Sequence, residues 1–174
     1  IFSFKNRGAY HKRVNLSDKK KSLGIIAASA GNHAQGVALA CKKLKIKCNI
    51  VMPVTAPENK LNNVKRLGAK VTLYGENLAH ALVKASKMSK QNKYTFVHPF
   101  DDPFTIAGQG TVGKEILDDE IDYDVIFVPV GGGGLLAGIS AWVKQHKKKI
   151  KIIGVEVNDS ACLTEALKSN KRVM

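Results

Sequence analysis

Four consecutive glycines, Gly131 to Gly134, are the strongest candidate for chemistry in this sequence, and Leu135 follows them. They stand between an apolar run and a helical pattern, so they are expected to join a buried strand to a helix. Backbone N–H groups without neighbouring side chains can converge on an anion at the positive end of a helix dipole. A simple turn needs only one or two glycines. The run therefore favours a cradle for a phosphate over a flexible turn.

Two other anion-binding motifs fit this loop less well. A P-loop requires Gly-Lys-Ser/Thr, but Leu135 and Leu136 follow the glycines here. The dinucleotide fingerprint requires GxGxxG spacing and an acidic residue that ends the next strand, where Glu156 stands. A dinucleotide site with Glu156 on the ribose remains the weaker alternative.

A second loop of small residues and N–H donors spans Ser29 to Gly36, with the sequence Ser-Ala-Gly-Asn-His-Ala-Gln-Gly. It also joins a strand to the start of a helix, a place that suits a carboxylate or another anion. Asn32 could cap the helix or donate its amide to a ligand oxygen. His33 alone is ambiguous, because a histidine at a helix start is more often structural than catalytic.

Lys5 becomes a candidate only in combination with these two loops. A single lysine says little in a chain in which 28 of the residues are Lys or Arg. A lysine in a desolvated site can have a lowered pKa and form a Schiff base with a carbonyl cofactor. A phosphate cradle, an anion-binding loop and one such lysine together describe pyridoxal phosphate chemistry.

Strands and helices that alternate along the chain must position these loops. The expected strands are 24–28, 48–52, 70–74, 94–97, 124–130 and 149–156, and the expected helices are 32–45, 57–68, 77–91, 108–117, 135–147 and 162–168, with a loop at 98–104. This order predicts an α/β fold with right-handed crossovers and a parallel sheet that helices cover on both faces. Ligands of such sheets bind at the loops that leave the carboxyl ends of strands, where both candidate loops stand.

The charge balance, 28 basic against 14 acidic residues and a net charge of +14, first suggests a polyanionic partner. However, lysines in short groups along the whole chain make up most of the excess, and only four basic residues are arginines. Proteins that read nucleic acids favour arginine, and single-strand binders add stacking aromatics. We therefore expect solvated surface charge and no nucleic-acid partner, with a basic binding module as the alternative from another class.

Composition also bears on membranes, metals and disulfides. No stretch approaches the ~18 apolar residues of a membrane span, so no membrane partner is expected. The three cysteines, Cys41, Cys48 and Cys162, show no CxxC pair. No metal-ligand set or disulfide framework is readable, and each cysteine is expected to pack as a small apolar residue in a reducing compartment.

Four segments together resemble the fold-type II pyridoxal-phosphate enzymes, and within them the biosynthetic threonine dehydratases (threonine deaminases). The segments are Ser3-Phe4-Lys5-x-Arg7-Gly8-Ala9, residues 29–36, Ala107-Gly108-Gln109-Gly110-Thr111 and Val128-Pro129-Val130 with the four glycines. They span the chain in the order of the family. The stretches 99–101 and 155–163 are similar to the branch that serves isoleucine synthesis.

The resemblance implies a tryptophan synthase beta-like fold of two open parallel-sheet α/β domains, incomplete here. Residues 24–101 would form the small mobile domain, and 1–23 with 102–174 would form parts of the large cofactor-binding domain. The chain is expected to be an internal fragment that lacks the rest of the catalytic domain and the regulatory domain, and to be catalytically incomplete alone. The whole enzyme would be a homo-oligomer, a tetramer in the family, in the cytoplasm or an organelle stroma.

The family's roles carry over residue by residue. Lys5 would bind pyridoxal 5′-phosphate and then remove the α-proton of L-threonine, which leads to 2-oxobutanoate and ammonia. Asn32 would contact the 3′-oxygen of the cofactor, and Gly131, Gly132, Gly133, Gly134 and Leu135 its phosphate. Ser29, Gly31, Asn32 and His33 would take the carboxylate of the small-molecule substrate, which is expected to be L-threonine, with L-serine as the alternative.

Ala30 separates reactions within this group. Serine racemases carry a serine at the corresponding place, where it acts as the acid and base on the second face of the substrate. Alanine cannot move a proton, so the sequence favours elimination over racemisation. A related serine/threonine dehydratase or a serine racemase of the same fold is the alternative.

Overall fold

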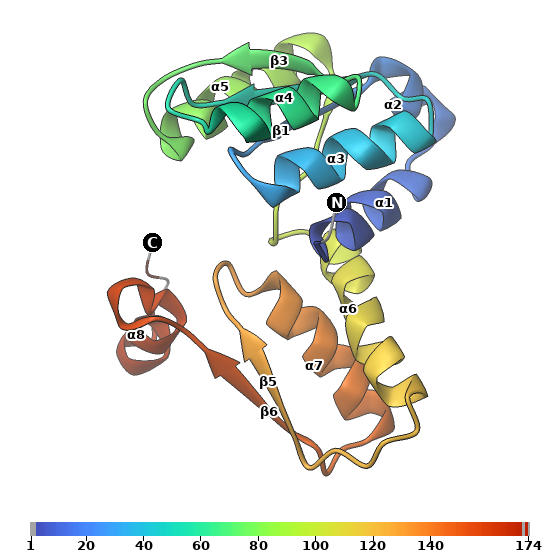
Figure 1. Cartoon of the computed structure of the whole chain (residues 1–174), viewed down its shortest axis with the longest axis vertical. Coiled ribbons are helices and arrows are strands. Elements are labelled where there is room, and N and C mark those ends of the chain that lie inside the picture. Colours follow the sequence, from blue (N-terminus) through green and yellow to red (C-terminus); the bar gives the residue numbers. More distant parts are fainter. Residues whose placement is uncertain (1–2, 172, 174) are drawn as a thin grey trace. The chain divides into compact units, whose positions relative to one another are not determined.

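The structure is a computed structural model that describes residues 3–171 and 173. It contains two compact units, residues 1–108 and 109–174, and each is described by itself (Figure 1). The division at 24–101 that the family resemblance implies stays a prediction.

The first unit is built on a parallel sheet of four strands in the order β3-β2-β1-β4. The strands are β1 (Ile25–Ala28), β2 (Cys48–Met52), β3 (Lys70–Leu73) and β4 (Thr95–Phe96). Every residue of β1 and β2 is buried. Such continuous burial is typical of parallel strands covered on both faces, and it confirms the α/β class.

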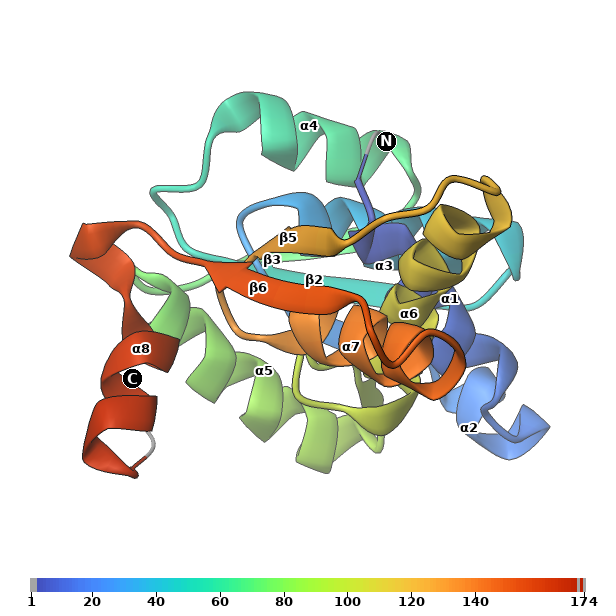
Figure 2. The ribbon, with the colours of Figure 1, turned by 90° about the horizontal axis from the view of Figure 1, so that it is seen from below.

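Helices cover both faces of this sheet. The cluster of Ala34, Val37 and Val64 places α3 (Asn32–Lys43) and α4 (Glu58–Arg66) on one face. Ala81 and Ala85 pack α5 (Leu78–Asn92) against Ile26, Ala28 and Val51 on the other. Figure 2 shows α4 and α5 on opposite sides of the strands.

The strand order reverses beside β1, and this reversal locates a binding crevice. From β1 the chain proceeds to β2 and β3 on one side, whereas β4 pairs with the other side, with Ile25 opposite Thr95 and Ile26 opposite Phe96. In open α/β sheets the crevice outside the carboxyl ends at such a switch point receives the ligand. Here the segments that begin at Ser29 and Val97 flank it.

Two helices of the first unit were not expected from the sequence, α1 (Lys5–Val14) and α2 (Asp18–Leu23). The α1 sequence is polar and carries Gly8 at its centre, so it shows no apolar periodicity. It packs through Ala9 and Arg13, both 0% exposed. Because a buried arginine takes the place of an apolar residue, the apolar periodicity that predicts a helix is missing from α1.

Helix α6 (Pro103–Asp118) begins five residues before the predicted start at 108. The Oδ1 atom of Asp102 accepts a hydrogen bond of 3.0 Å from the backbone N–H of Thr105. Proline at the first helical position needs no hydrogen-bond partner for its nitrogen. The prediction of a loop through Phe104 was wrong because Asp102 and Pro103 together start a helix.

The second unit pairs the parallel strands β5 (Val125–Pro129) and β6 (Lys151–Val155). Ile126 and Val128 pack against Ile139 and Val143 of α7 (Gly134–His146). On the other face of the strands, Phe127 is 66% exposed. The turn η1 (Asn158–Ser160) and the helix α8 (Cys162–Ser169) follow β6.

Candidate active site

Lys5 is the first residue of α1, and its amine is held at the switch point of the first unit. The Nζ atom donates a hydrogen bond of 2.9 Å to the carbonyl oxygen of Pro99 and lies 5.1 Å from the centroid of the Phe4 ring. Burial lowers the pKa of the Lys5 amine because desolvation disfavours the charged form. A larger fraction of the amine is therefore unprotonated and able to act as a nucleophile or base.

The segment after β4 supplies carbonyl partners that no sequence pattern could reveal, since every residue carries a carbonyl. The Val97 oxygen lies 3.0 Å from His33 Nε2, and the Pro99 oxygen accepts from Lys5. A 2.6 Å ion pair between Lys12 Nζ and Asp102 Oδ2 ties the end of this segment to α1. The segment thus connects α1, which carries Lys5, to α3, which carries His33.

The loop after β1 presents open backbone at the start of α3. The Ser29 hydroxyl accepts a hydrogen bond of 3.1 Å from the Gly31 N–H, which gives the loop its turn. A Cβ atom added at Gly31 would meet no atom within 4 Å. The N–H groups of the first turn of α3 have no intrahelical acceptor, so this opening suits a carboxylate.

Asn32 does not cap α3, so that interpretation was wrong. The helix begins at Asn32 itself, and Gly31 is the N-cap residue. The Oδ1 atom of Asn32 accepts from Lys60 Nζ at 3.2 Å, which leaves the amide Nδ2 as the donor to a ligand. The side chain borders a hollow of about 400 Å³ lined by Ser3, Asn32, Gln35, Leu39, Lys60, Asn63, Arg66 and Leu67.

His33 is a neutral, buried histidine. Burial lowers its pKa to about 4 against the opposing effect of the hydrogen bond to Val97, and Lys5, His98 and Arg13 lower the pKa further. With Nε2 bonded to the Val97 oxygen, the buried Nδ1 is left as an acceptor that has no partner among the described residues. An acceptor cannot donate to a carboxylate, so we expect the backbone N–H of His33 to make any carboxylate contact.

The glycine loop belongs to the second unit and leaves the carboxyl end of β5. Gly133 is the N-cap of α7 and has a φ of +81°, which favours glycine. A Cβ atom added at Gly131 or Gly133 would meet nothing within 4 Å. The loop therefore presents open space at the positive end of α7, as the phosphate-cradle prediction requires.

Glu156 has a structural partner in the second unit. Its carboxylate accepts hydrogen bonds from the backbone N–H groups of Leu163 at 2.9 Å and Thr164 at 2.8 Å, at the start of α8. These bonds lower the pKa of the exposed carboxyl. Because they occupy both oxygens, the structure does not favour the dinucleotide alternative.

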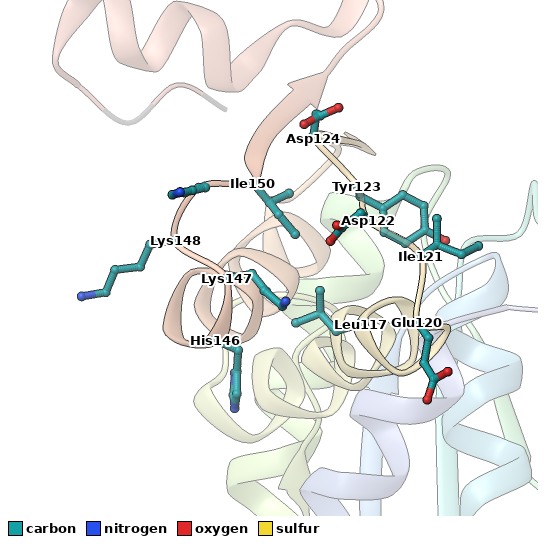
Figure 3. A pocket seen from close by; sticks show the side chains of 11 residues that line it. Leu117, Glu120, Ile121, Asp122, Tyr123, Asp124, His146, Lys147, Lys148 and Ile150 are labelled. Carbon is teal, nitrogen blue, oxygen red and sulfur yellow. The ribbon is translucent and has the colours of Figure 1, made fainter.

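A larger hollow of the second unit, about 580 Å³, lies at the opposite strand ends (Figure 3). It is lined by Leu117, Glu120, Ile121, Asp122, Tyr123, Asp124, His146, Lys147, Lys148, Lys149 and Ile150. It lies where β5 and β6 begin, whereas ligands of parallel sheets bind where strands end. None of the predicted site residues lines it.

The structure places the predicted residues in two groups. Lys5, Ser29, Gly31, Asn32 and His33 belong to the first unit, where they accompany the carboxyl ends of β1 and β4. The second group, Gly131, Gly132, Gly133, Gly134 and Leu135, follows β5 in the second unit.

The model of one protein family, described as "Pyridoxal-phosphate dependent enzyme", matches residues 1–174. The chain belongs to this family. A biosynthetic L-threonine dehydratase of Haemophilus influenzae is 53% identical over 96% of the chain. The processed form of threonine deaminase isoform 2 from Solanum lycopersicum superposes with a TM-score of 0.96 at 47% identity over 99% of the chain. A maize serine racemase superposes with a TM-score of 0.95 at 32% identity over 99% of the chain.

The chain spans only part of each relative. It covers 33% of the H. influenzae protein, 50% of the solved tomato chain and 52% of the maize chain. The tryptophan synthase-like, fold-type II architecture expected from the sequence is confirmed by these structural relatives.

The residues present fit the family's cofactor. Pyridoxal phosphate offers an aldehyde, a ring oxygen and a phosphate. The half-buried amine of Lys5, the Nδ2 donor of Asn32 and the open glycine loop before α7 match these three groups in chemistry.

Neither a cluster of metal ligands nor a membrane-spanning helix is found among the described residues. Within 3–171 and 173, no three or more His, Cys, Asp and Glu side chains gather as metal ligands. No helix in the same part of the chain combines the length and apolarity needed to cross a bilayer.

The pH dependence of stability is expected to reveal the neutral state of His33. A histidine whose pKa falls from 6.5 to about 4 on folding contributes stability above pH 6.5 that is lost as the pH falls toward 4. The loss amounts to about 1.4 kcal/mol per pH unit in that window. Denaturant unfolding between pH 7 and 4 should therefore show a shallower decline for His33→Gln than for the wild type. Equal slopes for the wild type and His33→Gln would contradict a neutral His33.

Gly131→Ala is expected to separate cofactor binding from folding. The added methyl group meets no protein atom within 4 Å, so the free energy of unfolding should stay unchanged. If the phosphate occupies that space, the affinity for pyridoxal phosphate should fall at least about tenfold, or ~1.4 kcal/mol. Absorbance titration measures the affinity, with the exposed Ala141→Ser of α7 as the control. Unchanged affinity in Gly131→Ala would place the phosphate elsewhere.

Proposed function

We propose that the enzyme containing this chain deaminates L-threonine to 2-oxobutanoate and ammonia, with pyridoxal phosphate, in isoleucine biosynthesis. The observation that carries this proposal is 53% identity over 96% of the chain to a protein named a biosynthetic L-threonine dehydratase. The chain covers 33% of that relative, so the reaction is proposed for the whole enzyme.

We expect Lys5 to be the catalytic base and the residue that holds the cofactor. Its Nζ atom would hold the cofactor, and the free amine would take the proton from Cα of threonine. Burial supports both steps because it lowers the pKa of the amine. The bound cofactor supplies an electron sink that stabilises the negative charge left at Cα.

The remaining site residues would bind and orient the substrate and the cofactor. The N–H groups of the Ser29 to His33 loop would hold the substrate carboxylate, and the glycine loop before α7 would hold the cofactor phosphate. Asn32 would donate to the ring oxygen. The Pro99 carbonyl oxygen accepts a hydrogen bond from the Lys5 amine and keeps that amine at the switch point.

Ala30 supports elimination over racemisation. A racemase needs a proton donor on the face opposite the lysine, and a methyl side chain cannot supply one. The lower identity to maize serine racemase, 32% against 47% for the tomato threonine deaminase, agrees with this choice.

Product analysis of the natural, full-length enzyme tests the proposal. With pyridoxal phosphate and L-threonine, we expect 2-oxobutanoate and ammonia in equal amounts. With L-serine, we expect pyruvate and little D-serine. D-serine formation at a rate comparable to elimination would contradict the argument from Ala30, and no 2-oxobutanoate from threonine would contradict the proposed reaction.

The proposal includes the assembly and its location. We expect a homo-oligomer, by resemblance a tetramer, in the cytoplasm or an organelle stroma. Light scattering of the holoenzyme measures the assembly, and a monomer would contradict it.

A further inference from the structure

Arg13 is a buried positive charge of the first unit that the proposed function does not use. The residue is 0% exposed. Its Nε donates to the Ala9 oxygen at 2.9 Å, and its Nη1 donates to the Val37 oxygen at 2.6 Å and to Cys41 Sγ at 2.8 Å. Nη2 is buried and has no partner among the described residues. A guanidinium remains protonated in proteins, and burying it without a counter-charge is costly.

Two thiols favour the charged form of Arg13. Cys41, near the end of α3, is 1% exposed, and Cys48, at the start of β2, is 8% exposed. No carboxylate contributes to the electrostatic environment of Arg13 among the described residues, where Cys41 and Cys48 act on it. Only a thiol can therefore provide the negative charge.

We propose that Cys41 is a thiolate in the folded protein, paired with the Arg13 guanidinium, while Cys48 keeps its proton and donates it to the Cys41 sulfur. The three residues form a charged clamp inside the first unit. This proposal does not depend on the proposed function.

Electrostatics agrees with this assignment of the charge. Hydrogen bonds from Cys48 and Arg13 and the Arg13 charge lower the pKa of Cys41, against an opposing effect of burial. The hydrogen bond to Cys41, and then burial, raise the pKa of Cys48. Between the two thiols, only Cys41 has a direct hydrogen bond to Arg13, so we assign the ionised state to Cys41. In this assignment Cys41 carries a charge, whereas the sequence led us to expect a small apolar residue there.

The clamp joins the two helices that carry the catalytic candidates. Arg13 lies on α1, which begins with Lys5, and Cys41 lies on α3, which begins with Asn32 and His33. These helices pack closely: a Cβ atom at Gly36 of α3 would lie 3.0 Å from the Lys5 carbonyl carbon (Figure 1). Arg13 and Cys41 are therefore positioning residues that hold Lys5 against the start of α3.

Far-ultraviolet thiolate absorption tests the proposal directly. In a Cys162→Ser chain, Cys41 and Cys48 are the remaining thiols. We expect this protein to show the thiolate band at pH 7, with an amplitude of one thiolate, and to lose the band as the pH falls. The additional change Cys41→Ser should abolish the band at neutral pH, whereas Arg13→Lys, which keeps the charge, should preserve it.

Arg13→Met should move the appearance of the band upward by at least about one pH unit, toward the ordinary range of a thiol. Circular dichroism checks that each variant is folded. Should Arg13→Met or Cys41→Ser fail to fold, the titration of the Cys162→Ser chain decides alone. A band that appears only in the ordinary thiol range, or one indifferent to Arg13→Met in a folded protein, would overturn the proposal.

Discussion

Lys5→Ala is expected to abolish the bond between the enzyme and pyridoxal phosphate and to lower threonine deamination by about 10³-fold or more. The variant removes the nucleophile that bonds the cofactor and the base that takes the α-proton. The amine donates a hydrogen bond to the Pro99 oxygen, and its burial disfavours its charge. The fold should therefore tolerate the loss, and the unfolding free energy should change little.

Absorbance of the loaded holoenzyme and the rate of 2-oxobutanoate formation measure these effects. Lys43→Ala, an exposed lysine near the end of α3, is the matched control and should behave like the wild type. Lys5→Arg keeps the positive charge but has no amine that can bond an aldehyde in the same way, so it should also lose the cofactor band. A normal band and rate in Lys5→Ala would assign the chemistry to another lysine.

Gly108→Ala is expected to destabilise the first unit by about 3 kcal/mol, the upper end of typical overpacking costs. An added Cβ atom would lie 2.6 Å from Gly8 Cα and 2.8 Å from the Arg7 oxygen. These are backbone atoms of α1, which cannot rotate away as a side chain can. The helix that starts with Lys5 would have to move, so cofactor binding should weaken as well.

Chemical denaturation of Gly108→Ala measures the cost. Ala107→Ser is the matched control because Ala107 is the preceding residue of α6 and is exposed. We expect the control to unfold like the wild type. If the two variants unfold at the same denaturant concentration, the close contact between α1 and α6 is not as described.

The central part of the fold could be predicted because its strands are buried on both faces. Ile25 to Ala28 and Cys48 to Met52 read as apolar runs between turn residues, and the structure places strands there. Helix α1 could not be predicted in this way. Its buried positions include a glycine, an alanine and Arg13, so the apolar spacing that marks a helix is missing.

Residue type alone was enough to select Lys5, Asn32 and the glycine run as site candidates, whereas their backbone partners could not be selected in this way. The partners of Lys5 and His33 are the carbonyls of Pro99 and Val97, and a carbonyl is common to all residues. The pairing of Arg13 with Cys41 joins residues 28 positions apart, and only the packing of α1 on α3 reveals it.

Borohydride reduction of the enzyme loaded with pyridoxal phosphate tests the central claim most directly. Reduction makes the link between a lysine amine and the cofactor permanent, and mass spectrometry of the digested protein then locates the pyridoxyl group. We predict that the group resides on the peptide with Lys5 and is absent from the same digest of Lys5→Ala. A pyridoxyl group on another lysine, with Lys5 unmodified, would contradict the assignment of Lys5 as the cofactor-binding residue.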